Sequence, residues 1–286
     1  MKKTAVSFAV LGALLAFGSQ LAQAAPDWSK VPKRDIQVFH AGVTPIEWIT
    51  KKSDHSGRVG LTKGESCVGC HEEKGGLNFD MKRLASKDLE PVGAPKTMNF
   101  PVTVQAAYDK DNAYIRLTFK APAGGANAAD KENEVKVAVM FANDKVSAAA
   151  GDKTIPGDQV GCWATCHTDA RTMPGADDKK TKYVANGAYE LMQWKSAKGA
   201  KAVDGSVSDK RNMEGGTAGV KAEGENKGGT YTVTFTRKLS GALAEGKSVP
   251  FGVAVHADHA TGRFHHVSMG YKLGFGADGD IKASKQ

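Results

Sequence analysis

Two short segments of the chain combine paired cysteines with a histidine directly after the second cysteine. The first, CVGCH, spans residues 67–71, and the second, CWATCH, spans residues 162–167. In such a segment the two thiols can form thioethers with the vinyl groups of a haem, while the adjacent imidazole binds the iron. The sequence therefore predicts two covalently bound haem c groups, held by the thiols of Cys67, Cys70, Cys162 and Cys166 and ligated by His71 and His167.

The second motif departs from the usual spacing. Three residues separate Cys162 from Cys166, whereas two separate Cys67 from Cys70, so the longer loop must bulge to present both sulfurs to one porphyrin. Disulfides within or between the motifs, or a zinc ion held by two cysteines from each, are the alternatives. A disulfide framework gives no reason for the histidine that follows each second cysteine.

The first 24 residues have the features of a secretory signal peptide. Lys2 and Lys3 precede an apolar run over residues 5–17, and Ala22-Gln23-Ala24 forms a small-x-small cleavage site. The run is too short to span a bilayer, although an uncleaved anchor is the alternative. We expect a mature chain that begins near residue 25, lies in the periplasm and has no membrane span.

The charge balance is weakly basic. Lys and Arg number 39 against 31 Asp and Glu, a formal charge of +8, and loss of Lys2 and Lys3 would lower it to +6. The propionates of two haems would offset most of this excess. Because no Arg-rich or aromatic-interleaved patch is present, nucleic acid is not expected as a partner. Lysines around a haem edge would instead steer an acidic redox protein.

Two regions that differ in composition and in hydrophobic periodicity follow the predicted signal peptide. Residues 25–99 show little periodicity and much Gly, Lys and Asp, which predicts an irregular N-terminal module with the first haem as its core. Residues 100–286 contain short β-rich runs separated by turn signals and predict a mainly β fold, a β-sandwich that carries the second haem. The predicted strands are 102–108, 114–119, 134–141, 189–194, 231–236, 249–256 and 264–273.

Six of the eight histidines lie outside the two motifs and are candidates for the second axial position of each iron. His40 and His55 precede the first motif, and His55 lies twelve residues before Cys67, close enough to fold back over the porphyrin. The other four, His256, His259, His265 and His266, belong to the last two predicted strands or the turn between them. Period-two alternation places His265 on an interior face with Val267 and Met269, and His266 on the opposite face.

Taken together, these motifs resemble the haem-binding subunit of ethylbenzene dehydrogenase and its relatives, in particular the exported di-haem c-type cytochromes. The resemblance rests on residues 55–57, 67–71, 161–167, 169–174, 253–256 and 265–268. It implies a DOMON-like β-sandwich with its own covalent haem, preceded by a module that carries another.

The resemblance also bears on the axial ligands. In the b-haem members a methionine and a C-terminal lysine hold the iron, and His265 falls at the lysine's position when Val267-Ser268 is the anchor. We therefore predict that His265 binds opposite His167, and His55 opposite His71. His40 is the alternative for the first iron, and the alternatives for the second are His256, His259, His266 and Met173.

The predicted function is electron transfer through two six-coordinate haems, with no catalytic residues. The expected partners are periplasmic redox proteins, namely a quinol-oxidising membrane cytochrome and a terminal reductase or dehydrogenase. Two other functions remain open. One is a di-haem enzyme with one open iron, a peroxidase or a small oxide reductase, and the other is the haem subunit of a molybdenum oxidoreductase.

Overall fold

The computed structural model describes residues 25–40, 57–72, 95–124, 128–150, 153–166, 184, 186–262 and 264–286. The predicted signal peptide lies outside these residues, as do three of the predicted ligands, His55, His167 and Met173. Within the described ranges, no helix is long and apolar enough to cross a membrane.

Strands dominate the described part of the chain. They are β1 (Arg34–Phe39), β2 (Asn99–Tyr108), β3 (Asn112–Lys120), β4 (Lys136–Ala142), β5 (Ser147–Ala150), β6 (Lys153–Pro156), β7 (Tyr189–Lys195), β8 (Val203–Val207), β9 (Arg211–Asn212), β10 (Lys221–Lys227), β11 (Thr230–Lys238), β12 (Lys247–His256), β13 (His266–Ser268), β14 (Tyr271–Phe275) and β15 (Ile281–Lys285). The helices are short: α2 (Gly57–Thr62), α3 (Cys67–His71), α5 (Gly157–Val160), α6 (Cys162–Thr165) and the 3-10 turn η2 (Gly241–Leu243).

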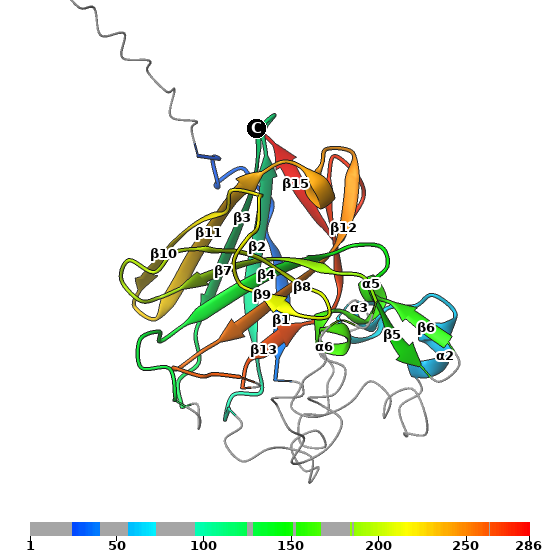
Figure 1. Cartoon of the computed structure of the whole chain (residues 1–286), viewed down its shortest axis with the longest axis horizontal. Helices are drawn as coiled ribbons and strands as arrows, with labels where there is room; N and C mark the ends of the chain where they lie inside the picture. The colour runs from blue at the N-terminus through cyan, green and yellow to red at the C-terminus, as the bar shows by residue number, and fades with distance from the viewer. Residues whose placement is uncertain are drawn as a thin grey trace, which may run out of the picture.

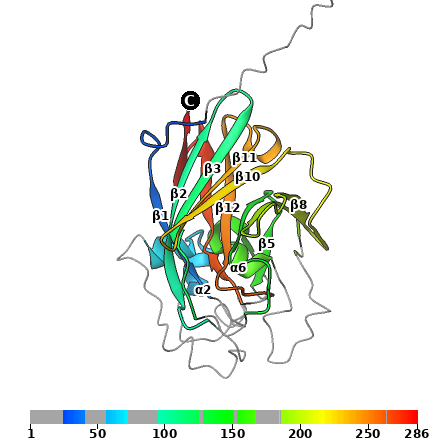
Figure 2. The same ribbon diagram turned by 90° about the vertical axis from the view of Figure 1, so that its left-hand side faces the viewer.

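One sheet folds over itself to make two layers. Its order is β10-β11-β3-β2-β1-β13-β12-β4-β7-β8-β9, and β15 closes the other side by pairing with both β14 and the end of β2. Figures 1 and 2 show the layer of β2, β3, β10 and β11 facing the layer that contains β12. The main hydrophobic core lies between the layers, with Val104, Ile115 and Val233 from the first layer and Val139 and Val253 from the second.

The two layers differ in what covers their outer faces. In β11 the inward residues are buried, whereas the intervening threonines, such as Thr232 and Thr234, are only half-buried. In β4 the outward residues Ala138 and Met140 are buried as well, because further parts of the chain pack on this side. The short helices therefore pack on the outer face of β4 and β12.

The mainly β fold is confirmed, and the predicted strands correspond to β2, β3, β4, β7, β11, β12 and the β13–β14 region. The turn that joins β2 to β3 is also found, with the Asp109 N–H donating to Asn112 O at 2.9 Å. The predicted strand 264–273 is wrong as a single element. It is interrupted at Met269 and Gly270, so alternation does not run through it.

Two regions outside the predicted strands also contain strands. Residues 34–39, assigned to the N-terminal module, form β1 between β2 and β13. Residues 198–229 contain β8, β9 and β10. All but one of the β10 side chains are exposed, so this strand has no apolar alternation from which it could have been predicted.

Candidate functional site

The first cysteine motif forms helix α3. Ser66 begins the helix by accepting a hydrogen bond from the Gly69 N–H at 3.1 Å, and Val68 is buried in the main core. Cys67 is half-buried, Cys70 is exposed, and neither forms a disulfide. Burial raises the pKa of Cys67 to about 12, so this sulfur is held as a neutral thiol. The Cys70 thiol donates to a carboxylate oxygen of Glu65 at 3.7 Å.

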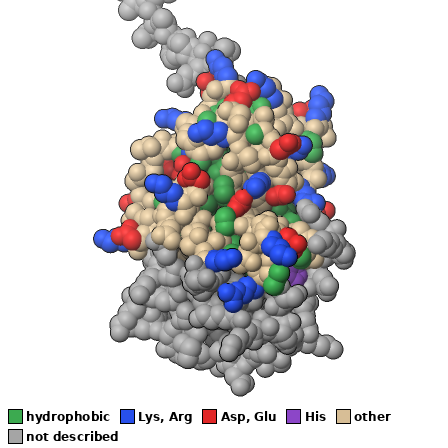
Figure 3. All heavy atoms as spheres, turned by 90° about the vertical axis from the view of Figure 1, so that its right-hand side faces the viewer, with side chains coloured by type: hydrophobic (Ala, Val, Ile, Leu, Met, Phe, Trp, Pro, Cys, Tyr) green, Lys and Arg blue, Asp and Glu red, His purple; other side chains and the backbone are tan. Residues whose placement is uncertain are grey.

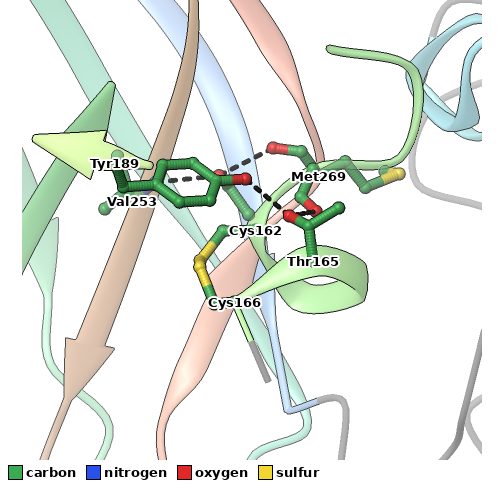
Figure 4. The surroundings of a disulfide bond; sticks show 8 residues. Cys162, Thr165, Cys166, Tyr189, Val253 and Met269 are labelled. Atoms are coloured by element: carbon green, nitrogen blue, oxygen red, sulfur yellow. Dashed lines mark hydrogen bonds between the residues drawn. A yellow bond between two sulfur atoms is a disulfide. The ribbon is translucent and has the colours of Figure 1, made fainter. Parts of the chain in front are cut away.

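Residues 162–165 of the second motif form helix α6, a single turn, and Cys162 at its start is joined by a disulfide to Cys166 just after its end (Figure 4). A disulfide within a motif was one of the alternatives to haem attachment that the sequence allowed. Both cysteines are buried. Sulfurs bonded to each other cannot form thioethers, so haem attachment at this motif requires that the disulfide first be reduced.

Helix α6 is held against the sheet by a hydroxyl pair and a close backbone approach. Thr165 Oγ1 donates to Gly161 O at 2.9 Å and lies 2.5 Å from the Tyr189 hydroxyl on β7 (Figure 4). Gly161 has a φ of +85°, and a Cβ there would lie 2.2 Å from Gly270 N. A Cβ on Gly270 would in turn lie 2.8 Å from Gly161 N. These two glycines allow the second motif to enter the gap between β13 and β14.

The surface under α6 is lined by small residues. Gly252 and Ala254 of β12 pair with Met140 and Ala138 of β4, so these side chains share the outer face. A Cβ on Gly252 would lie 3.4 Å from the Cβ of Cys162. The absence of a side chain at Gly252 therefore lets the first cysteine of the second motif lie directly against β12.

The two motifs are neighbours in space. The side-chain amide of Gln159 on α5 donates to Leu61 O at 2.9 Å and to Glu65 O at 2.6 Å, and so links α5 to the turn between α2 and α3. Phe39 at the end of β1 packs edge-to-face on Trp163 of α6, with ring centroids 6.0 Å apart. Figure 1 shows α3, α5 and α6 together on one side of the sandwich. Any groups bound to the two motifs therefore lie on the same side.

His265 and His256 lie at one end of the face that carries α6. Their ring centroids are 4.8 Å apart, and both donate toward the carbonyl of Gly262, through Nδ1 of His265 at 2.8 Å and Nε2 of His256 at 3.1 Å. His265 is half-buried and lies just before β13 rather than within it. Desolvation lowers the pKa of His265 to about 4 and that of His256 well below its usual value. Both rings are therefore neutral, the form that binds iron.

His266 points into the sandwich. It pairs across the sheet with Val255, packs on Phe100 with ring centroids 4.9 Å apart, and donates from Nε2 to Thr97 O at 2.7 Å. Its Nδ1 is buried without a hydrogen-bond partner, and desolvation lowers its pKa to about 4. The fully buried residue of this pair is thus His266, not His265 as alternation predicted, because the β13 face that bears Val267 is the outer one.

The two remaining described candidates are His40 and His259. His40 is fully buried, and its Nδ1 lies 3.2 Å from His265 O, so it belongs to the same end of the sandwich as His265 and His266. His259 lies in the turn after β12, where Nδ1 donates to Asp130 O at 2.7 Å. Among the described residues, no group of three or more His, Cys, Asp and Glu is placed to hold a metal ion.

Sequence reasoning missed the residues that hold the motifs in place. Gln159, Tyr189 and Gly270 lie far from the cysteines in the sequence or carry no motif of their own. No local signal could have found Tyr189 or Gln159, because their contacts exist only after the sheet has formed. The glycine of Ser268-Met269-Gly270 could have suggested a break in the last strand.

Comparison with known proteins places the chain among haem proteins. A family model described as ethylbenzene dehydrogenase matches residues 25–218. Cytochrome c-551 of Rhodocyclus tenuis is 47% identical over 263 residues, which cover 92% of this chain and 100% of the relative. Cytochrome c-552 of Stutzerimonas stutzeri is 48% identical over 301 residues, which cover both chains in full. One solved structure is also similar, a carbohydrate-binding module of family 9 from Caldicellulosiruptor kristjanssonii in complex with glucose. The match covers 59% of this chain and 65% of that chain, with 11% identity and a TM-score of 0.31. A similarity this low supports no conclusion about fold or function.

Proposed function

Because the chain belongs to the ethylbenzene dehydrogenase family, we propose that it is a periplasmic di-haem c-type cytochrome that passes single electrons between respiratory redox proteins. The two relatives are named as cytochromes c and are matched over their whole lengths. The chain is accordingly a cytochrome of the c type, an electron carrier rather than an enzyme. The number of haems, the compartment and the partners belong to the proposal.

The residues present fit two haems. At the first motif Cys67 and Cys70 are thiols outside any disulfide, one helical turn apart and next to the buried Val68. At the second, Cys162 and Cys166 lie over the outer face of β12, with Cys162 packed against Gly252, and they could hold a haem once their disulfide is reduced. A bound haem supplies an iron that accepts and returns one electron. The chain has to hold the two haems, supply their axial ligands and keep water from the irons.

The hydrogen bonds of the histidines favour His265 as the ligand opposite His167. Nδ1 of His265 donates to a backbone carbonyl, which leaves the lone pair on Nε2, the nitrogen that points away from the backbone. Nε2 of His256 is instead occupied by Gly262 O, and Nε2 of His266 by Thr97 O. The tautomer set by the Nδ1 hydrogen bond of His265 is thus the one in which Nε2 can act as a ligand, and we keep His265 as the ligand opposite His167. For the first iron we keep His71 with His55, and His40 as the alternative.

The observation that carries the proposal is the contact between the two motifs. Gln159 joins α5 to both ends of the turn before α3, and Trp163 of α6 packs on Phe39. Two haems bound here would lie side by side on one layer of the sandwich. This arrangement suits a carrier that receives an electron at one haem and releases it from the other.

The partners that we propose are acidic periplasmic redox proteins. Figure 3 shows the side of the molecule that carries the short helices, where lysine and arginine side chains are spread over the surface among acidic ones. The formal excess of +6 in the chain without Lys2 and Lys3 would accelerate encounter with a negatively charged partner at low ionic strength. A quinol-oxidising membrane cytochrome fits as donor, and a terminal reductase or a dehydrogenase as the partner on the other side.

Low-temperature electron paramagnetic resonance of the oxidised, purified protein tests the proposal. Two low-spin ferric signals are expected, because each iron would have a protein ligand on both sides. A high-spin signal that integrates to one iron per chain would mean an open coordination position. That result would contradict the carrier and favour a di-haem enzyme.

Single variants test the axial ligands. His265→Ala should convert the second haem alone to high spin, and His256→Ala, His259→Ala and His266→Ala should leave it low-spin. His55→Ala should convert the first haem alone. An unchanged spectrum in His55→Ala, with conversion in His40→Ala, would move the first assignment to His40.

A further inference from the structure

We propose that Glu72 is a positioning residue for the haem at the first motif: it anchors the iron ligand His71 to the sandwich and, with Arg34, sets the electrostatic field at that iron. This inference rests on the proposed function. Glu72 follows His71 directly, and its own N–H closes helix α3 by donating to Val68 O at 2.8 Å. Its side chain is only 9% exposed.

The Glu72 carboxylate fills an open place in the sheet. The ladder between β1 and β13 ends at the pair Val38 and Ser268, so the N–H of Gln37 has no strand partner on that side. Glu72 Oε1 accepts this N–H at 3.2 Å. Helix α3 therefore enters at the interruption after β13, the same interruption into which Gly161 fits from the other motif.

Two further side chains converge on the same carboxylate. The hydroxyl of Tyr271, the first residue of β14, donates to Oε1, and Arg34 Nη2 lies 3.7 Å from Oε2. Tyr271 is fully buried, and burial together with the neighbouring carboxylate raises its pKa, so it remains a donor. Glu72 thus joins α3 to β1 and to β14 through three contacts made by one side chain.

This anchor has a consequence for the iron. A helix of five residues cannot hold its own conformation, so the orientation of the His71 ring depends on what fixes the next residue. A buried carboxylate on the residue next to an iron ligand would also stabilise the ferric state relative to the ferrous state, because the ferric haem carries one more positive charge. Arg34 acts in the opposite direction.

Spectroscopic redox titration of the holoprotein tests the inference, with the two haems resolved by their spectra. Glu72→Gln keeps an acceptor oxygen but removes the charge, and should favour reduction of the first haem about tenfold, equivalent to about 59 mV for a one-electron couple. Arg34→Gln should shift the same haem in the opposite direction. The second haem should keep its potential in both variants.

A matched control is present elsewhere in the fold. Glu245 also accepts from a tyrosine, Tyr108, and pairs with a cation, Lys285, but it precedes β12 and contacts no part of either motif that the structure describes. Glu245→Gln should leave both potentials unchanged. Arg34→Gln, at a half-exposed site, serves if Glu72→Gln does not fold.

Shifts of the same sign in the Glu72 and Arg34 variants, or no shift in either, would overturn the role of Glu72 while two low-spin haems remain present. Failure of the proposed function would look different. In that case mass spectrometry of the unsubstituted protein would find no haem at Cys67 and Cys70, and there would be no first-haem potential to shift.

Discussion

Gly161 is the residue whose replacement tests how the second motif is held. Its φ is +85°, and an added Cβ would lie 2.2 Å from the backbone nitrogen of Gly270. With a ψ of 179°, Gly161 lies in a backbone region that is essentially restricted to glycine, and alanine there costs about 1–3 kcal/mol. Overpacking against backbone that cannot withdraw adds about 1–3 kcal/mol. We therefore expect Gly161→Ala to lower the free energy of unfolding by about 2–6 kcal/mol.

Gly199 is the matched control, because it has a φ of +76° and nothing within 4 Å of an added Cβ. Gly199→Ala should cost only the conformational part, about 1–2 kcal/mol. Urea unfolding followed by circular dichroism measures both losses. Because Gly161 seats α6 on the sheet, its variant should also carry less haem at Cys162 and Cys166. Equal losses of stability in the two variants, with full haem content in both, would refute the close-approach argument.

Two other predictions concern the strands that border the site. Ser268 Oγ accepts from the buried Val253 N–H at 2.9 Å and donates to Met269 O at 2.8 Å (Figure 4 draws Val253 and Met269), so Ser268→Ala should lower the unfolding free energy by about 1–3 kcal/mol. The control Ser240→Ala removes no cap hydrogen bond and should change the unfolding free energy by less than about 0.5 kcal/mol. A loss in Ser268→Ala as small as that of the control would contradict a stabilising role for the two Ser268 hydrogen bonds. The pKa of His266 is about 4 in the fold against 6.5 ordinarily, so the unfolded chain binds a proton in that interval that the folded chain does not, and stability should fall as the pH drops from 6.5 to 4. Between pH 6.5 and 4, the urea midpoint of His266→Gln should depend less steeply on pH than that of the unsubstituted protein. An identical pH dependence would mean that His266 does not cause the loss of stability.

The strands that pack against the core could be predicted from the sequence, because apolar and polar residues alternate along them. Tyr231, Val233 and Phe235 repeat at every second position, and β11 follows them. Strand β10 pairs along the edge with side chains that are almost all exposed, so its composition resembles that of a loop. The interruption after Ser268 has a long-range cause, since it accommodates chain segments more than a hundred residues away.

The cysteine motifs could be recognised because covalent haem attachment depends on local spacing. Their proximity to each other could not be predicted, because it depends on Gln159, Phe39 and Trp163 meeting across the sheet. The choice among the C-terminal histidines shows the same limit. Period-two alternation places His265 on the same face as Val267, but only the pairing of β12 with β13 shows that this face is the outer one. The hydrogen bond of each ring then distinguishes His265 from His256.

The central claim is that both motifs carry haem, and denaturing mass spectrometry with peptide mapping of the protein purified from its native compartment tests it most directly. We predict a chain heavier by two haem masses, with one haem on the peptide that contains Cys67 and Cys70 and one on the peptide that contains Cys162 and Cys166. A gain of one haem mass, with the disulfide between Cys162 and Cys166 intact, would contradict it.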